Sequence, residues 1–429
     1  QIWRYFFVVC ERPQNCPLQP IEKEEEMQPK QKDVIRELGR RYAEIAALPR
    51  QRETINGWRR LNGLQSDTRP MVRLDQLPWD ELDWGEEEMV NREGLFRMVE
   101  RRLRMTIYAW ENFKADMVVL PYFGINKTVR NASLGPAAEV ERMGLSQHYA
   151  EQLATVEEVQ ALETPKIETD PELDQRQLEQ VSEVLDGILP VKLTGHVRHT
   201  GLWDLISIKI SPERMLYDLI DRPDYVRTLI GKFVEMESGV LDQFEEHGLL
   251  EPAPAEIHCT GAFCDELPSP EYDGKKAMAR DTWVFSMAQM FSEVSPAMQE
   301  EFDILPLKPL LERYGLVYYG CCEPLHNKID IVRKINNVRK ISVSPWANKE
   351  ISAEQIHGDY VFSAKPNPSH VAMGSFDADL VRRDLTETVE ICRRHNTPCE
   401  LILKDVSTVC NDPRRLTEWE KIAMEVAQR

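Results

Sequence analysis

Hydrophobic and polar positions follow two different patterns along the chain. In the first third, apolar residues recur every three or four positions, as at Leu38 and Tyr42, which predicts amphipathic helices over 27–62 and 88–114. Residues 69–84, between these two stretches, are rich in Trp, Asp and Pro and are expected to form a loop. The N-terminal third is therefore predicted to be a helical layer.

After residue 115, short apolar runs alternate with helical patterns, which is typical of β–α units around a parallel sheet. The runs are almost continuously apolar, as expected for strands that are buried on both faces. Candidate strands are 117–120, 190–193, 256–259, 317–319, 340–343, 360–363 and 400–403, with an eighth candidate at 302–307. Candidate helices are 175–186, 212–220, 223–246, 281–300, 326–336, 377–395 and 412–427. This number of strands favours an α/β fold of the (β/α)8 TIM-barrel type.

The predicted organisation has three parts. Residues 1–26 are expected to be a disordered leader, because a short apolar stretch without signal-peptide features runs into prolines and a glutamate run. Residues 27–114 form the helical N-terminal layer, and residues 115–429 form the barrel. The barrel contains an acidic insertion at about 131–188, and an insertion after a barrel strand commonly helps to cover the active site.

The charge balance excludes several classes of partner. The chain has 429 residues, with 53 Lys and Arg against 72 Asp and Glu, which gives a formal net charge of −19. Nucleic acids and anionic membranes need clustered positive charge, so neither is expected as a partner. No apolar stretch approaches the roughly 18 residues of a membrane-spanning helix. We therefore expect a cytoplasmic protein.

Several of the nine cysteines follow the predicted strands. In a parallel barrel, catalytic groups lie just beyond the carboxyl ends of the strands. His258 follows one candidate strand, Cys322 and Glu323 follow another, and Cys410 follows the last. Thiolate, imidazole and carboxylate groups are the ligands that zinc prefers, and a catalytic zinc keeps one position open. The pattern predicts a zinc site assembled from several strand ends.

Each of these residues also has a structural interpretation. Free cysteine is among the most buried residue types, so a cysteine at a strand end can simply be a small core residue. His258 can equally be a hydrogen-bonded structural histidine. Lys404 and Asp405, at the end of the last candidate strand, can form an internal ion pair rather than a catalytic pair. These alternatives stay open at the level of sequence.

Four segments resemble the uroporphyrinogen decarboxylase superfamily. The resemblance covers roughly residues 100–428, and it implies a (β/α)8 barrel, in agreement with the strand pattern. The similar segments are ADMVV at 115–119, TGLW at 200–203, MLYDLIDRP at 215–223 and YGCCEP at 319–324, followed by Asp412-Pro413 before the last helix.

Two kinds of chemistry occur in this superfamily. The true decarboxylases carry an arginine-rich stretch near the N-terminus and an aspartate after the first strand, whereas this chain lacks the stretch and has Gly124 in place of the aspartate. The other branch consists of zinc methyltransferases that work with corrinoid proteins. Their zinc commonly binds a His-x-Cys pair and a cysteine after the last strand. The corresponding residues here are Gly320, Cys322 and Cys410, so Glu323 or His258 would replace the missing histidine.

The resemblance therefore implies a zinc-assisted methyltransferase. It would move a methyl group between a small methylated substrate (an ether, an amine or a thiol) and a corrinoid protein, with a homodimer as one option for its assembly. Cys322, Cys410, Glu323 and His258 are the candidate zinc ligands, and Glu323 and His258 are also the candidate catalytic residues. The alternatives are a metal-free decarboxylase or lyase that acts on another substrate, and a non-catalytic corrinoid- or tetrapyrrole-binding protein.

Overall fold

A computed structural model of the chain describes residues 28–65, 67–143 and 146–429. The predicted leader at 1–26 lies outside this part of the chain. None of the helices in the described ranges is long and apolar enough to cross a membrane.

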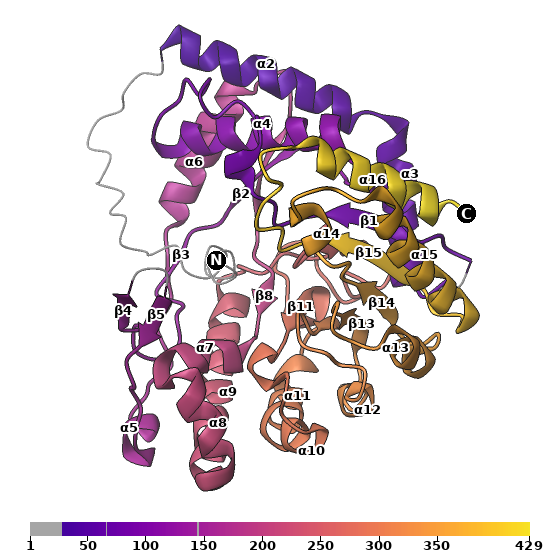
Figure 1. Cartoon of the computed structure of the whole chain (residues 1–429). Helices are drawn as coiled ribbons and strands as arrows, with labels where there is room; N and C mark the ends of the chain where they lie inside the picture. Colours follow the sequence, from indigo (N-terminus) through magenta and orange to yellow (C-terminus); the bar gives the residue numbers. More distant parts are fainter. Residues whose placement is uncertain (1–27, 66, 144–145) are drawn as a thin grey trace.

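The centre of the molecule is a curled sheet of seven parallel strands (Figure 1). Its interior strands are buried along almost their whole length, which explains their nearly continuous apolar runs. In spatial order the strands are β1 (Met71–Leu74), β15 (Cys399–Leu403), β14 (Val361–Ala364), β13 (Val338–Val343), β12 (Leu316–Tyr319), β11 (Trp283–Ser286) and β8 (Arg198–His199).

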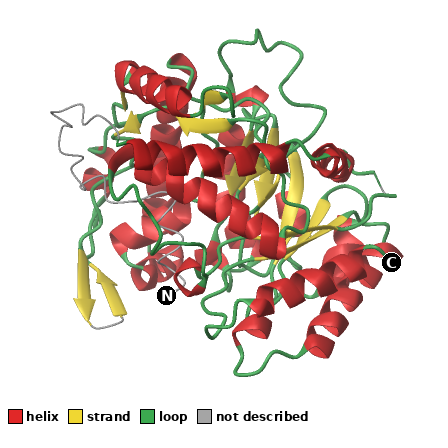
Figure 2. Cartoon of the chain, turned by 90° about the horizontal axis from the view of Figure 1, so that it is seen from above, coloured by secondary structure: helices red, strands yellow, loops and turns green. Residues whose placement is uncertain are grey.

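The sheet curls as a barrel does, but its described strands do not close into a ring. The two edge strands, β1 and β8, have no ladder between them, so the predicted eight-stranded closure is not seen. The strands lie in the interior with helices around them (Figure 2). The helices that follow β8 along the chain are α7 (Leu202–Ile210), α8 (Pro212–Asp221), α9 (Pro223–Glu246), α10 (Pro296–Gln299), α11 (Leu305–Leu311), α12 (Ile329–Val332), α13 (Lys349–Ile356), α14 (Ser369–Ala372), α15 (Ala378–Arg394) and α16 (Arg414–Ala427).

The N-terminal part forms a separate helical layer with its own core. This layer contains the helices α2 (Pro29–Ala46), α4 (Gly94–Phe113) and α6 (Pro171–Val184) and the parallel strand pair β2 (Phe123–Asn126) and β7 (Val191–Thr194). Helix α3 (Pro49–Asn62) follows α2 along the chain but does not join this layer. The apolar stripes of α2 and α4 face each other and pack against α6 and β2. Buried members of this core are Ile35, Val99, Leu103, Phe123 and Val181. The sequence pattern predicted helices within 27–62 and 88–114, whereas α6, β2 and β7 join this layer from beyond residue 114.

The predicted insertion at about 131–188 contains helix α6, which belongs to the helical layer, and several small elements in and beside it. The small elements are the antiparallel pairs β3 (Val129–Arg130) with β6 (Glu168–Thr169) and β4 (Val140–Met143) with β5 (Ser146–Tyr149), and the short helix α5 (Val156–Gln160).

Two predictions for the central sheet were wrong because a strand was hidden by its surroundings. Residues 69–84 were expected to be a loop, yet β1 lies there and pairs with β15, with Met71 and Val72 buried. The flanking prolines and Arg73 interrupt the apolar run. Residues 281–300 were expected to be a helix, yet they begin with β11, whose aromatic and β-branched side chains favour a strand.

Four candidate strands do not belong to the central sheet. Residues 190–193 overlap β7, which pairs with β2 outside this sheet. Residues 302–307 are helical, because their apolar positions continue a helical turn into α11. Residues 117–120 have no strand structure. Residues 256–259 contain β9 (Glu256–Ile257), which turns back at once into β10 (Thr260–Gly261) and forms a small antiparallel hairpin.

Candidate functional site

Two thiols and a buried ammonium group meet at the carboxyl end of the sheet. Cys321 and Cys322 follow β12, and their sulfur atoms lie 3.6 Å apart. Lys404 follows β15, and its Nζ lies 3.1 Å from Cys321 Sγ and 3.7 Å from Cys322 Sγ. Its side chain is 2 % exposed, so this charge lies inside the protein. The adjacent carboxylate of Asp405 accepts a hydrogen bond from Lys404 at 2.6 Å, which is the ion pair that the sequence suggested.

Cys322 is the more accessible of the two thiols. It is half-buried, whereas Cys321 is fully buried. The thiol of Cys322 donates to Asp405 Oδ2 at 3.5 Å, and the carboxyl group of Asp405 is itself 19 % exposed. An incoming molecule would therefore contact Cys322 and Asp405, with Cys321 and Lys404 behind them.

His258 completes the cluster from the β9–β10 turn. Its Nε2 lies 3.5 Å from Cys321 Sγ, and its ring stacks on Phe285 with centroids 4.0 Å apart. Burial lowers the pKa of His258 well below its usual value, and the charge of Lys404 adds to this effect. The imidazole is therefore neutral at physiological pH.

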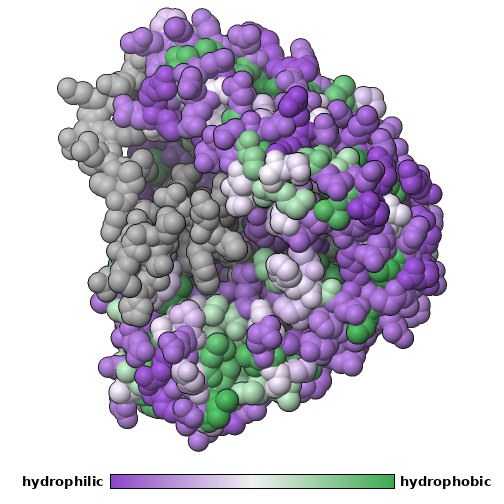
Figure 3. Space-filling view, viewed as in Figure 1, coloured by the Kyte–Doolittle hydropathy of each residue, from purple (hydrophilic) through white to green (hydrophobic). Residues whose placement is uncertain are grey.

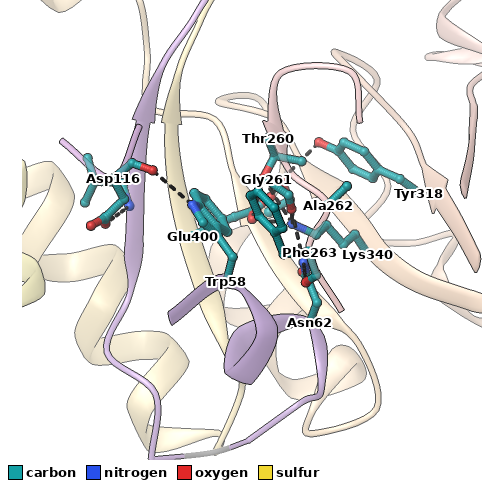
Figure 4. A network of polar contacts seen from close by, with 12 residues as sticks. Trp58, Asn62, Asp116, Thr260, Gly261, Ala262, Phe263, Tyr318, Lys340 and Glu400 are labelled. Carbon is teal, nitrogen blue, oxygen red and sulfur yellow. Dashed lines mark hydrogen bonds and ion pairs between the residues drawn. The ribbon is translucent and has the colours of Figure 1, made fainter. Parts of the chain in front are cut away.

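A buried polar network holds the hairpin that carries His258 (Figure 4). Lys340 Nζ donates to Thr260 Oγ1 and to Gly261 O, both at 3.0 Å, and to Glu400 Oε2 at 2.7 Å. Thr260 Oγ1 also donates to Glu400 at 2.7 Å. Lys340 and Glu400 are both 0 % exposed. This network ties the hairpin to β13 and β15 and so fixes the turn at His258.

Three backbone positions in the site lie in the left-handed region. They are His258 at φ 49°, Gly320 at φ 90° and Asp405 at φ 57°. Non-glycine residues rarely adopt such angles, and strained positions of this kind cluster at functional sites. A Cβ atom on Gly320 would lie 2.4 Å from Leu325 Cδ1. A histidine therefore cannot replace Gly320 without local rearrangement.

The environment assigns different protonation states to the cluster. Burial raises the pKa of the Cys321 thiol well above its usual value, and the neighbouring Cys322 adds to this, so Cys321 stays protonated. Burial alone would lower the pKa of Lys404. The negative charge of the Asp405 carboxylate opposes burial, and a negative charge on either cysteine sulfur would add to this effect, so this pKa lies well above its usual value. Lys404 is therefore protonated at neutral pH.

Glu323 faces away from the thiols and organises the backbone. It is 0 % exposed, and its carboxylate accepts hydrogen bonds from Ala288 N at 3.1 Å and from Cys321 N at 2.9 Å. Burial, with Glu323 as a second cause, raises the pKa of Asp204 to about 8. Burial also raises the pKa of Asp303 to about 7. Asp204 and Asp303 thus form a buried acidic region behind the site, and their raised pKa values let them hold protons near neutral pH.

Cys410 lies apart from the thiol cluster. It is exposed, and its sulfur atom donates to the carbonyl oxygens of Ala372 at 3.4 Å and Met373 at 3.7 Å. Of the four candidate ligands, the structure thus brings Cys322 and His258 to the same sulfur atom, that of Cys321. Glu323 and Cys410 have other partners.

The arrangement does not fit a zinc ion as it stands. Two sulfur ligands of a tetrahedral zinc lie about 3.7 Å apart, and the two thiols meet this condition. However, the ammonium group of Lys404 already contacts both sulfurs. Among the described side chains, no three His, Cys, Asp or Glu residues are arranged to hold a metal ion. The cation of this site is therefore a lysine side chain.

The sequence reasoning did not select Cys321, and it treated Lys404 and Asp405 only as a structural pair. The available signal was their position at strand ends, which all three share with the selected residues. Their convergence depends on how the strands are ordered in the sheet, and a single sequence does not give that order.

No protein-family model matches the chain, and no curated protein matches its sequence. Among solved structures, the chain is similar to a methyltransferase from Methanosarcina mazei, with 10 % sequence identity and a TM-score of 0.45. The match covers 85 % of this chain and 96 % of that protein. Similarity at this level does not define a shared activity.

Proposed function

We propose that the chain is a methyltransferase that moves a methyl group from a small methylated donor to the corrinoid of a partner protein. The observation that carries the proposal is the ammonium group of Lys404 beside two thiols at the carboxyl end of the sheet. A fixed positive charge at this place stabilises negative charge that develops as the methyl group leaves its donor. The family resemblance adds the methyl transfer and the corrinoid partner to this electrostatic argument.

Cys322 is the general acid of the proposed reaction. As the methyl carbon bonds to the acceptor, the electron pair of the breaking bond passes to the heteroatom of the donor, and this atom takes the proton of the Cys322 thiol. The reduced cobalt of the corrinoid supplies the electron pair for the new bond. The thiolate that remains on Cys322 lies 3.7 Å from Lys404 Nζ, which stabilises it. Asp405, within reach of both solvent and Cys322 Sγ, returns a proton from water.

Three neighbouring side chains support Cys322 and Lys404 in this role. Cys321 and His258 stay neutral and shield Lys404 from water. Glu323 fixes the backbone at Cys321 and thereby the orientation of both thiols.

The test measures methylcobalamin formation by the purified full chain with 4-methoxybenzoate and free cob(I)alamin under anaerobic conditions. The Cys322→Ser variant is expected to lose at least about 100-fold in kcat, the usual contribution of a general acid. Unchanged kcat in Cys322→Ser would refute the role of the thiol, and no turnover of any ether, amine or thiol donor would refute the proposed function.

Zinc assistance is the second candidate, because the spacing of the two sulfurs suits a zinc ion. Metal analysis and the Cys410→Ser variant separate the two mechanisms. With Lys404 as the cation, zinc is substoichiometric and Cys410→Ser keeps its activity within about twofold. Stoichiometric zinc that is lost in both Cys322→Ser and Cys410→Ser would establish the zinc mechanism.

A further inference from the structure

The two cysteines of the thiol cluster are neighbours both in the sequence and in space. Cys321 and Cys322 follow Gly320 in an irregular segment between β12 and α12, and their sulfur atoms lie 3.6 Å apart. A disulfide bond is about 2 Å long, so about 1.6 Å of movement would join the two sulfurs. The proposed methyl transfer uses only the thiol of Cys322 as an acid, and it gives the second thiol no chemical step.

The pair has one accessible thiol and one protected thiol. Cys322 is half-buried and can meet a small molecule from solvent, whereas Cys321 is 0 % exposed behind it. The ammonium group of Lys404 lies 3.7 Å from Cys322 Sγ and stabilises the thiolate, which is the form that attacks an oxidant. An accessible thiol beside a second thiol that can resolve it is typical of an oxidation site.

The other cysteines in the described part of the chain lack this combination. Four of them are buried, namely Cys259, Cys264, Cys392 and Cys399, although the last two contact each other. Cys410 is exposed, and the contacts of its sulfur in the described ranges are with two backbone carbonyl oxygens. An oxidant from solvent therefore meets a thiol pair only at Cys322.

The charge of the protein favours a neutral oxidant. The chain has a net charge of −19, and most of the surface visible in Figure 3 is hydrophilic. The carboxylate of Asp405 is 19 % exposed and accepts a hydrogen bond from the thiol of Cys322 at 3.5 Å, so negative charge lies beside the accessible thiol. These charges repel an anionic oxidant such as glutathione disulfide, whereas hydrogen peroxide is small and uncharged.

We propose that Cys321 and Cys322 are a modification site, at which a peroxide produces a reversible disulfide bond. The sulfur of Cys322 attacks one oxygen of hydrogen peroxide, the O–O bond breaks, and the departing hydroxide takes the thiol proton and leaves as water. The sulfur of Cys321 then attacks the sulfur of the sulfenic acid on Cys322. The S–O bond breaks, and this second hydroxide takes the thiol proton of Cys321. Both sulfurs are oxidised, and the peroxide is reduced to two molecules of water.

The disulfide bond is expected to be easy to reduce. Adjacent Cα atoms are about 3.8 Å apart across a trans peptide bond, less than the roughly 4.4–6.8 Å that is usual for a disulfide. Two hydrogen bonds also hold the backbone of Cys321, one from its N to Glu323 at 2.9 Å and one to its O from Ser342 Oγ at 2.7 Å. Strained disulfides are readily reduced, and such labile bonds are the ones that regulate activity.

Oxidation of the pair would also stop methyl transfer. A disulfide has no thiol proton, so Cys322 could not protonate the heteroatom of the donor. This consequence rests on the proposed function, whereas the formation of the disulfide rests on the thiol cluster alone.

Peptide mapping of the purified full chain tests the disulfide directly. The chain is treated with hydrogen peroxide, its remaining thiols are alkylated in urea, and it is digested with trypsin. Cleavage after Arg313 and Lys328 leaves both cysteines in the peptide 314–328. This peptide is expected to lose two hydrogen masses and to carry no alkyl group. Reduction of the oxidised chain with glutathione is expected to restore two alkylated thiols.

Three controls accompany the mapping. Cys392 and Cys399 are expected to stay alkylated, because both thiols are buried. Cys410→Ser is expected to show the same mass change in peptide 314–328 as wild type. In Cys321→Ser the sulfenic acid on Cys322 has no resolving thiol, so dimedone, a reagent for sulfenic acids, is expected to trap it. Glutathione disulfide in place of peroxide is expected to act at least about tenfold more slowly.

Two results would overturn the inference. The first is a peptide 314–328 that keeps both thiols at every peroxide dose that oxidises Cys410. The second is a cross-link from this peptide to the one that carries Lys404, which would show that the sulfur reacts with the amine instead. A disulfide that forms as expected but leaves methyl transfer unchanged would refute the proposed role of Cys322 and leave the oxidation site in place.

Discussion

At the scale of single residues, the thiol cluster depends on backbone positions that few side chains tolerate. Gly320 at φ 90° directs the chain from β12 into the two cysteines, and it has no room for a Cβ atom. His258 and Asp405 adopt left-handed angles without being glycine. Strain of this kind persists only where the surrounding contacts enforce it, and here those contacts are the hairpin network and the Lys404–Asp405 ion pair.

Gly320→Ala is expected to destabilise the protein by roughly 2–4 kcal/mol, because it combines an unfavourable φ with a clash against Leu325. Urea unfolding measures the change. Gly231→Ala is the control, since Gly231 lies within α9 with open space at its Cβ position, and alanine there is expected to raise stability by up to about 1 kcal/mol. Equal stability of Gly320→Ala and wild type would contradict the strain argument.

The acidic region behind the site predicts a fall in stability at alkaline pH. The pKa of Asp204 is about 8 in the folded protein against 3.8 for an ordinary aspartate, so folding holds a proton that the unfolded chain releases. The contribution of Asp204 to the free energy of unfolding is complete below about pH 4 and is lost as the pH rises toward 8. His258, whose pKa is lowered, has the opposite effect, and only below its ordinary value of 6.5.

Urea unfolding at pH 6.5 and at pH 8 measures the effect of the carboxyl groups on stability, because the opposite effect of His258 lies below this range. Wild type is expected to lose up to about 2 kcal/mol between these values for a single carboxyl group. Asp204→Asn is expected to reduce this loss, whereas Asp221→Asn, at an exposed end of α8, keeps it. An identical pH slope in Asp204→Asn and wild type would show that Asp204 is not the group responsible.

At the scale of elements, periodicity predicted those segments whose environment is uniform. The strands β12 to β15 are buried on both faces, and the helices α8, α9, α15 and α16 have one apolar side, so each pattern is complete within its own segment. β1 was not predicted because Arg73 interrupts its apolar pattern. The guanidinium group of Arg73 forms an ion pair with Glu256 of the β9–β10 hairpin at 2.7 Å. The candidate strand at 256–259 was misassigned to the central sheet, because a short hairpin strand and a barrel strand cannot be told apart over so few residues.

The thiol cluster contains only part of the predicted set of site residues. Position at a strand end indicated His258 and Cys322, both of which join the cluster. The role of Lys404 could not be predicted, because an ammonium group between two thiols requires β15 and β12 to be brought together by the curl of the sheet. Cys410 follows the same strand end but lies farther along the loop, toward α14.

The hairpin network predicts a strong and specific stability effect. Lys340→Met is expected to cost about 3–5 kcal/mol, because it removes the ion-pair partner of a fully buried carboxylate. The double variant Lys340→Met/Glu400→Met is expected to recover part of this loss, since it removes both charges. Urea unfolding measures both variants, with the exposed pair Lys32–Glu183 as a control in which Lys32→Met has little effect. A double variant as unstable as the sum of the two single ones would argue against coupling.

At the scale of the whole molecule, the sheet has an open side between β8 and β1. The helical layer of α2, α4 and α6 lies on this side, with its own hydrophobic core. The molecule thus has two packing units around one curled sheet. A homodimer and a cytoplasmic location stay predictions.

Hydrogen exchange is expected to reflect the open side of the sheet. Peptides that cover β8, a two-residue edge strand, are expected to exchange at least about tenfold faster than peptides that cover β13, which has a partner on each side. Mass spectrometry of the exchanging full chain gives this comparison directly. Equal protection of the two strands would indicate that a further segment completes the sheet.

The buried ammonium group of Lys404 has a consequence for how the site obtains its positive charge. A bound metal ion has a dissociation constant, competes with other ions and is lost to chelators or to scarcity, whereas a side-chain cation is synthesised with the chain and present in every folded copy. Chelators and metal starvation would leave such a site at full occupancy. Such a site is instead sensitive to covalent modification, because acetylation of a single amine or oxidation of the adjoining sulfurs would disable it until the modification is reversed.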